Sequence, residues 1–509
     1  MTGIRHRTAA AVLLGGVVVA GALLRLDGFG RDLPFAYNPD ETANLRPVLD
    51  YLLRGDLNPH RFYHPGSPLM YLAAAGLEGY RRLAGGPGRE AFIASFDCDP
   101  APFWLLARGV SLLAGLGAIA AVFGIARGFS GVRAGLAAAL FFALAPMPVK
   151  YSRVFRTDSL GVLLVLLAVF ASLALLRRSR GWGAAAGVLA GLAAATKYTS
   201  AAVLPAALAA AVLREPAPAG RGRGRLIGAA AVLGGFFAGF FLGAPYVVLD
   251  WSSAAAAFRV QSSSYYLQYP PVSAARAAAL YLGETVPYGA GGLAVAAAAL
   301  AGAVAAWRRS RRRLTVLLVF PVLYLLALVP AALRNPRYMV YVVPFVAVLA
   351  GVGTARAGEI LGRSRGGTAA VTVLLTALVG IFPLAQTLRD RTQTVGEDAR
   401  TAARRYLEET VPPGEGIAYE FGCPPLDQLD RGRWRLLDMK CNRIVWRPLE
   451  FYERRGFRYL IVNGFYKPMV LERPERWPEA ARRYRELERR PRVASFESGQ
   501  NRIDVYRIF

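Results

Sequence analysis

The sequence predicts a polytopic α-helical membrane protein that carries a small α/β domain at its C-terminal end. The chain has 509 residues, of which 54% are hydrophobic, and stretches of about 18 uncharged residues recur along it. A helix of that length crosses the hydrocarbon core of a bilayer, which is roughly 30 Å thick. The pattern stops near residue 388. We therefore expect a transmembrane domain over residues 1–388, with a long loop over 27–103, and a soluble domain over 389–509.

Eleven transmembrane helices are expected. The first, residues 9–24, follows Arg5, His6 and Arg7 and is typical of either a retained helix or a secretory signal peptide. The further spans that follow favour the retained helix. The pair between 183 and 213 has short members separated by Lys197, and we count it as two helices. The other ten spans are 104–126, 134–149, 159–176, 183–197, 199–213, 226–246, 285–306, 314–333, 338–355 and 368–388.

The formal net charge of +27 does not indicate nucleic-acid binding, because the basic residues gather in short loops between apolar spans. Threading the spans from a cytoplasmic N-terminus places these loops on one side, as the positive-inside rule requires. The loops 27–103 and 247–284 and the tail from 389 onward then lie outside a cytoplasmic membrane. The basic residues concerned are Arg127, Arg133, Arg177, Arg178, Arg180, Arg214, Arg221, Arg223, Arg225, Arg308, Arg309, Arg311, Arg312, Arg313, Arg356, Arg363 and Arg365.

The tail contains alternating helix and strand patterns. Residues 397–409 read as a helix that ends before Pro412-Pro413-Gly414, and 478–489 as a charged helix. Residues 416–419, 457–462 and 502–508 read as strands. These patterns predict a compact extracytoplasmic α/β module.

Several kinds of site are disfavoured by what the sequence lacks. The three cysteines, Cys98, Cys423 and Cys441, have no zinc-ligand spacing, and a disulfide between Cys423 and Cys441 is left open. There is no Gly-x-x-x-x-Gly-Lys phosphate loop, which argues against ATP as the energy source.

The most informative motif is Asn38-Pro39-Asp40-Glu41, about a dozen residues after the first span. Two adjacent carboxylates at the outer membrane face suit general-base chemistry. The same residues also suit a helix N-terminus, where acidic side chains interact favourably with the helix dipole. Both interpretations can hold together.

This motif and several others, in this order, resemble the C superfamily of polytopic glycosyltransferases. Within it, the nearest kin would be relatives of protein O-mannosyltransferases and aminoarabinose transferases (family 39-like). Where those mannosyltransferases have His-Pro-Pro-Leu, this chain has His-Pro-Gly-Ser-Pro-Leu. The other motifs are His64 to Leu69, Tyr151 to Ser159, Thr196-Lys197 and Asn335-Pro336-Arg337-Tyr338.

The resemblance implies a hexosyl- or pentosyltransferase that moves a sugar from a polyprenyl-phosphate donor to a hydroxyl of a glycan, lipid or protein acceptor. The lipid-linked sugar is a co-substrate. No cofactor is certain, and whether a divalent cation assists the carboxylates is open.

By the same resemblance, Asp40 is the catalytic base, Glu41 supports acceptor or loop geometry, and Asp158 shapes the acceptor side or holds a cation. A lipid phosphate that leaves needs preorganised cations, and Lys197, Arg337, Arg153 and Arg156 are the candidates. Lys197 equally suits a side chain that extends to the membrane interface, and Asp158 suits a helix N-terminus. The further substrate-binding candidates are Tyr338, beside Arg337, and His64, which we expect to orient a loop.

Two other classes of protein fit parts of the pattern. A secondary transporter or flippase also has many helices and charged groups in them, although its polar groups usually lie at the membrane midplane. A membrane scaffold that displays its tail to a partner would leave the charged set unexplained.

Overall fold

The computed structural model describes residues 2–62, 66–86, 88–177, 181–214, 221–268, 273–329, 335–392, 396–420, 422–428, 432–439, 443–464, 467–472, 474–499 and 501–509. The chain forms two units. The membrane unit comprises Met1–Gly30, Asp40–Phe92 and Phe103–Leu388, and the C-terminal unit comprises Arg31–Pro39, Ile93–Pro102 and Arg389–Phe509. The long loop 27–103, expected to belong to the transmembrane domain, is thus divided between the two units.

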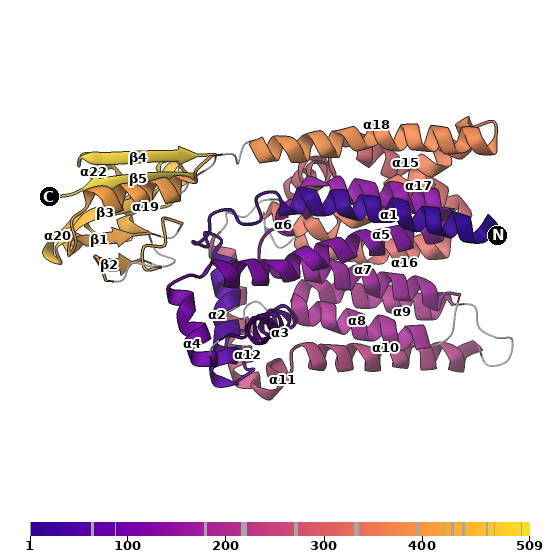
Figure 1. Cartoon of the computed structure of the whole chain (residues 1–509), viewed down its shortest axis with the longest axis horizontal. Helices are drawn as coiled ribbons and strands as arrows, with labels where there is room; N and C mark the ends of the chain where they lie inside the picture. The colour runs from indigo at the N-terminus through magenta and orange to yellow at the C-terminus, as the bar shows by residue number, and fades with distance from the viewer. Residues whose placement is uncertain are drawn as a thin grey trace. The chain divides into compact units, whose positions relative to one another are not determined.

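The membrane unit is a bundle of long helices with shorter helices at one end (Figure 1). Its elements are α1 (Thr2–Leu26), α2 (Pro39–Arg54), α3 (Ser67–Leu83), α4 (Arg89–Ala94), α5 (Ala101–Leu144), α6 (Pro146–Tyr151), α7 (Thr157–Leu175), α8 (Gly181–Thr196), η2 (Tyr198–Val203), α9 (Leu204–Leu213), α10 (Arg221–Gly243), α11 (Tyr246–Leu249), α12 (Trp251–Gln268), α13 (Ala274–Ala279), the π-helical η3 (Leu280–Thr285), α14 (Val286–Ala290), α15 (Leu293–Arg309), α16 (Arg311–Leu328), η4 (Pro336–Tyr341), α17 (Val343–Leu361) and α18 (Arg365–Thr392).

All eleven predicted spans contain helix, and the prediction of a multi-pass membrane protein is confirmed. The span 104–126 and the first part of 134–149 lie in α5, which is broken at Ser130 and Gly131, where the φ angle of Gly131 is 82°, and the end of 134–149 lies in α6. Among the described residues, six helices are long and apolar enough to cross a bilayer. A seventh is added if the bent pair Ala274–Ala290 and Leu293–Arg309 acts as one span. The number eleven stays a prediction.

Glycine allows α8 and α10 to pack backbone against backbone. A methyl group on Gly187 or Gly191 of α8 would lie 2.1 Å from a carbonyl oxygen of α10. Reciprocally, a methyl group on Gly239 of α10 would lie 2.2 Å from the carbonyl of Val188. Small residues bring membrane helices this close because no side chain separates them.

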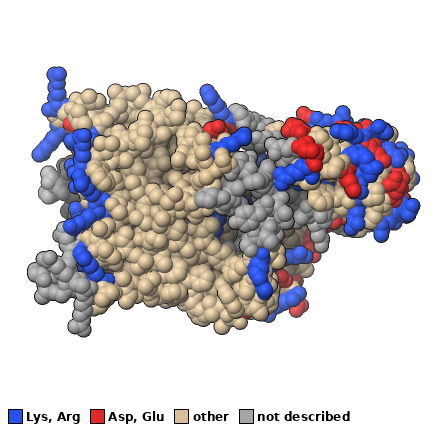
Figure 2. Space-filling model, turned by 180° about the vertical axis from the view of Figure 1, so that it is seen from behind, with Lys and Arg blue, Asp and Glu red and all other residues tan. Residues whose placement is uncertain are grey.

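Basic side chains gather at one end of the helical bundle, beside a broad band that lacks charge (Figure 2). This pattern is the one expected for helices that pass through a bilayer with basic loops on one side. Exposed members of the basic set include Arg127, Arg133, Arg177, Arg308, Arg309, Arg311, Arg312, Arg356, Arg363 and Arg365.

The C-terminal unit is a five-stranded sheet with helices on both faces. The strand order is β2-β1-β3-β5-β4; β1 runs parallel to β2 and β3, and β5 runs antiparallel to β3 and β4. Its elements are η1 (Ser95–Asp97), α19 (Ala399–Thr410), β1 (Gly416–Tyr419), β2 (Arg435–Asp438), η5 (Ile444–Trp446), α20 (Leu449–Arg454), β3 (Phe457–Asn463), α21 (Lys467–Leu471), α22 (Pro478–Leu487), β4 (Arg492–Ser498) and β5 (Asn501–Arg507).

Alternation along β3 divides the core of this unit into two layers. Leu460 and Val462 pack with Tyr452 of α20 and Tyr484 of α22, whereas Ile461 packs with the residues of α19. The predicted α/β module, with both predicted helices and all three predicted strands, is confirmed. The sequence did not predict β2 and β4, which are the two edge strands. An edge strand has a neighbour on one side only, so its apolar alternation is weaker.

The thiol of Cys423 is free and buried, with Sγ 3.4 Å from the carbonyl oxygen of Ile461. Its candidate disulfide partner, Cys441, lies outside the described residues.

Candidate active site

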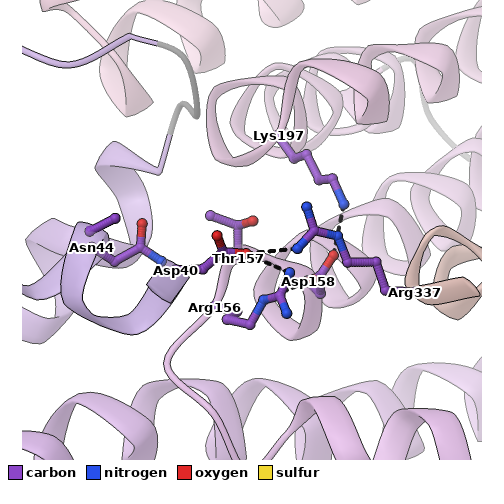
Figure 3. A pocket seen from close by; sticks show the side chains of 8 residues that line it. Asp40, Asn44, Arg156, Thr157, Asp158, Lys197 and Arg337 are labelled. Atoms are coloured by element: carbon purple, nitrogen blue, oxygen red, sulfur yellow. Dashed lines mark hydrogen bonds and ion pairs between the residues drawn. The ribbon is translucent and has the colours of Figure 1, made fainter. Parts of the chain in front are cut away.

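A polar pocket lies in the membrane unit where several helix ends meet (Figure 3). About 410 Å³ of empty space lies between the side chains that line it, a volume that includes open solvent. The residues that line it are Asp40, Ala43, Asn44, Arg156, Thr157, Asp158, Lys197 and Arg337.

Each charged side chain of the pocket comes from the end of a helical element. Asp40 lies in the first turn of α2, and Asp158 lies in the first turn of α7, two residues after the N-cap residue Arg156. Lys197 precedes η2. Arg337 lies at the start of η4, where the side chain of Asn335 accepts a hydrogen bond from the Arg337 amide. The sequence separates these residues by up to 297 positions, so only the tertiary fold brings them together.

Carboxylates and cations alternate through the pocket in one chain of ion pairs. Asp40 Oδ2 lies 2.7 Å from an Arg337 nitrogen and 2.6 Å from an Arg156 nitrogen. Arg156 Nε is also 3.4 Å from Asp158 Oδ2, and Lys197 Nζ is 2.7 Å from Asp158 Oδ1. With three cations and two carboxylates, the lining residues carry one net positive charge.

The two pocket carboxylates differ in their access to solvent. The side chain of Asp40 is 29% exposed, whereas that of Asp158 is 2% exposed. Asp40 is therefore the carboxylate that an incoming molecule can reach. Asp158 is buried between Lys197 and Arg156, where its charge holds both cations in place.

Lys197 also contacts two aromatic rings. Its Nζ lies 4.9 Å from the ring centre of Tyr338 and 4.8 Å from that of Tyr341. The Arg337 guanidinium lies over the ring of Tyr338, at 5.4 Å. Cation–π contacts of this kind stabilise a partly desolvated cation without neutralising its charge. Tyr338 therefore contacts the pocket cations without lining the pocket.

Glu41 does not line the pocket, although it follows Asp40 directly. Its carboxylate forms two hydrogen bonds with Arg108 of α5, at 2.8 and 2.9 Å, and also accepts one from the Phe155 amide. Both side chains of this pair are at most 5% exposed. Glu41 thus joins α2 to α5 and to the turn that precedes Arg156.

The remaining predicted residues have other positions. Arg153 donates to the carbonyl of Leu24 at the end of α1 and lies 4.0 Å from Asp27, and it does not line the pocket. His64 lies outside the described residues.

Two residues that the sequence interpretation missed belong to this region. Asn44 lies one helical turn after Asp40, lines the pocket and donates to the carbonyl of Phe155 at 3.2 Å. Its spacing of four residues from Asp40 was the available signal. Arg108 is an isolated charge inside the apolar span 104–126, and such a residue is expected to have a buried partner.

The described residues contain no group of three or more His, Cys, Asp or Glu side chains able to hold a metal ion. Of the described residues that line the pocket, Asp40 and Asp158 are the two carboxylates, and each is paired with two cations. Two carboxylates that are already neutralised by arginine and lysine do not form a donor set that fits a divalent cation.

Comparisons with known proteins agree with this architecture. No curated protein matches the chain in sequence, whereas residues 105–237 match the family model described as dolichyl-phosphate-mannose-protein mannosyltransferase. The structure of ArnT from Cupriavidus metallidurans bound to undecaprenyl phosphate is similar over 98% of both chains, with a TM-score of 0.55 and 16% identity.

Two archaeal structures are similar as well. The apo oligosaccharyltransferase of Archaeoglobus fulgidus matches 92% of this chain and 72% of its own, with a TM-score of 0.57 and 13% identity. The same organism's AglB, in complex with an inhibitory peptide and a dolichol-phosphate, matches 93% and 71%, with a TM-score of 0.54 and 13% identity. This chain therefore shares the fold of these membrane glycosyltransferase structures, which is the fold expected from the resemblance of its motifs.

Proposed function

We propose that this protein is a membrane glycosyltransferase that moves a sugar from a polyprenyl-phosphate donor to an acceptor hydroxyl at the outer face of the cytoplasmic membrane. The observation that carries the proposal is the reachable carboxylate of Asp40, held between Arg156 and Arg337 in a solvent-open pocket. The family match over residues 105–237 and the fold shared with ArnT and AglB support it.

The direction of the helices supports the proposed side of the membrane. α7 runs from Asp158 in the pocket to the basic end at Arg177, and its 19 residues extend about 28 Å, close to the thickness of the hydrocarbon core. α17 likewise runs from η4, which carries Arg337, towards Arg363. Because basic ends tend to stay in the cytoplasm, this direction supports a pocket that opens on the outer side.

The pocket has the groups that sugar transfer to a hydroxyl requires. Asp40 accepts the proton of the acceptor hydroxyl as that oxygen forms a bond with the anomeric carbon of the sugar. The bond between the anomeric carbon and the phosphate oxygen breaks, and its electron pair leaves with the polyprenyl phosphate. Arg156, Lys197 and Arg337 stabilise the negative charge that grows on this leaving group.

The resting ion pairs also indicate how the pocket prepares for the donor. In the structure Arg337 and Arg156 both bind the same oxygen of Asp40, Oδ2. A donor phosphate competes with that oxygen for the two guanidinium groups, since phosphate is a strong bidentate partner of arginine. Binding of the donor thereby frees a carboxylate oxygen for the proton of the acceptor.

The proposal is tested with the full-length protein in lipid nanodiscs, supplied with a panel of polyprenyl-phosphate sugars and an envelope extract as the source of acceptor. We expect acceptor-dependent release of polyprenyl phosphate together with a new glycosidic product. Asp40→Asn should lower turnover at least ~100-fold, the contribution of a general base, while donor binding persists. The matched control is Asp50→Asn, an exposed aspartate of the same helix α2.

The same preparation separates the proposal from transport. A transporter or flippase would move a labelled solute or lipid across sealed vesicles and form no glycosidic bond. Near-normal sugar transfer by Asp40→Asn would remove Asp40 as the base.

A further inference from the structure

The segment Arg31–Pro39 belongs to the C-terminal unit, although in sequence it connects α1 to α2. Asp40, the next residue, belongs to the membrane unit. The catalytic candidate therefore follows directly after a piece of chain that the C-terminal unit holds.

Phe35 and Tyr37 of this segment contact helix α19. The Tyr37 hydroxyl and the Thr401 Oγ1 of α19 are 2.6 Å apart. The Arg400 guanidinium lies 4.2 Å from the centre of the Tyr37 ring and donates to the Tyr37 carbonyl at 3.3 Å. One turn further, Arg404 lies 4.3 Å from the ring centre of Phe35. Ala36 and Tyr37 are buried as a result, at 4% and 9% exposure.

The two arginines are themselves fixed within the C-terminal unit. Arg400 forms two hydrogen bonds of 2.7 Å with Asp398, whose carboxylate also accepts from the Asn501 side chain of β5. Arg404 is bound to Glu408 and to the Pro425 carbonyl, and is 3% exposed. The rings of Phe35 and Tyr37 therefore form cation–π contacts with guanidinium groups that are held in place by other hydrogen bonds.

Little chain separates this anchor from the pocket. Only Asn38 and Pro39 lie between Tyr37 and Asp40, so the two Cα atoms are at most about 11 Å apart. Pro39 has a fixed φ angle and begins α2. Few rotatable backbone bonds therefore separate Tyr37 from Asp40. A displacement of Tyr37 is expected to displace Asp40 as well.

We propose that α19 of the C-terminal unit positions Asp40, with Arg400 and Thr401 holding Tyr37 and Arg404 holding Phe35. This proposal rests on the proposed function of Asp40 as the base. Arg400, Thr401 and Arg404 are positioning residues, since they contact the segment before Asp40 and do not line the pocket.

The experiment compares Arg400→Ala, Thr401→Val and Tyr37→Phe in the full-length protein in nanodiscs. The structure leads us to expect a fall in kcat on the order of tenfold for Arg400→Ala, because small misplacements of a catalytic group are costly, with the KM for the donor unchanged. Arg400→Lys keeps a cation over the ring and should recover part of the loss. Arg405→Ala is the matched control, since Arg405 lies on the same helix, is 61% exposed and pairs only with Glu397 among the contacts described for it.

A double-mutant cycle keeps the test specific. Tyr37→Phe and Thr401→Val remove the two sides of one hydrogen bond, so their effects on kcat should not add. Additive losses, or wild-type kcat in Arg400→Ala, would overturn the proposal.

A second measurement does not depend on activity. Hydrogen exchange of the amides in the first turn of α2 should accelerate in Arg400→Ala, while exchange in α7 should stay unchanged. Unchanged exchange in that turn would also overturn the positioning role. Failure of the proposed function would appear differently, as accelerated exchange in the variant together with no sugar transfer by the wild-type protein.

Discussion

Glu41 and Arg108 form a buried ion pair in which both carboxylate oxygens accept from the same guanidinium, at 2.8 and 2.9 Å. The pair ties the first turn of α2 to α5, and Glu41 also binds the amide of Phe155 next to Arg156. The acid that neighbours Asp40 in sequence therefore holds the two sides of the pocket together.

Removal of one partner of this pair should destabilise the membrane unit. We expect Arg108→Ala to lower the free energy of unfolding by about 3–5 kcal/mol, since it leaves the Glu41 charge buried and unpaired. Thermal unfolding of the purified protein in detergent measures the effect. The double variant Glu41→Leu/Arg108→Met should lose less stability than Arg108→Ala, and Arg46→Ala, an exposed residue of α2, should lose almost none. Equal losses in the single and double variants would contradict the buried-charge explanation.

Arg337 should act on the donor. Arg337→Ala removes a guanidinium that can bind the donor phosphate, a charge-assisted hydrogen bond worth about 1.5–3 kcal/mol. This corresponds to roughly a 10- to 100-fold loss in kcat/KM for the donor. Arg337→Lys keeps the positive charge, so its kcat/KM for the donor should lie between the values of the wild-type protein and Arg337→Ala. Steady-state kinetics with varied donor concentration measures this, and unchanged donor kinetics in Arg337→Ala would exclude Arg337 from phosphate binding.

The glycine contacts between α8 and α10 give a prediction on stability. Gly239→Ala places a methyl group 2.2 Å from the Val188 carbonyl, so the helices must separate and the folded state should lose about 1–3 kcal/mol. Gly234→Ala is the matched control on α10, because a methyl group there meets nothing within 4 Å. The measurement is the melting temperature of each variant. Equal melting temperatures would show that the close approach of α8 and α10 does not contribute to stability.

Stability of the C-terminal unit should depend on pH through Glu420, which follows β1. Burial raises the pKa of Glu420 to about 7, against the two hydrogen bonds from the Asn463 and Ile444 amides, which favour the ionised form. The folded state binds the proton more tightly than the unfolded state, so stability falls as pH rises from about 4.5 to about 7. The full effect is about 3 kcal/mol.

Hydrogen exchange of the β1 and β3 amides at several pH values, corrected for intrinsic exchange, measures this dependence. Glu420→Gln cannot ionise and should remove the dependence, although it lowers overall stability because its amide group faces a backbone donor. If the stability of Glu420→Gln still fell with rising pH, another titratable group would be the cause.

The sequence by itself predicted the membrane architecture, the C-terminal α/β unit and most residues that line the pocket. Hydrophobic run length is a local property, so it predicted helices in all eleven spans and the change of composition after residue 388. Asp40, Arg156, Asp158, Lys197 and Arg337 were recognisable because they occur in motifs that resemble a known family.

Only the tertiary structure decided which of these residues act together. Asp40 and Glu41 are adjacent in sequence and chemically alike, yet one lines a pocket and the other is buried against Arg108. Arg153 and Arg156 differ in the same way, since the first caps α1 and the second joins the pocket carboxylates. Successive residues of a turn or helix point in different directions, and their partners come from helices more than 60 residues away, which no local pattern records.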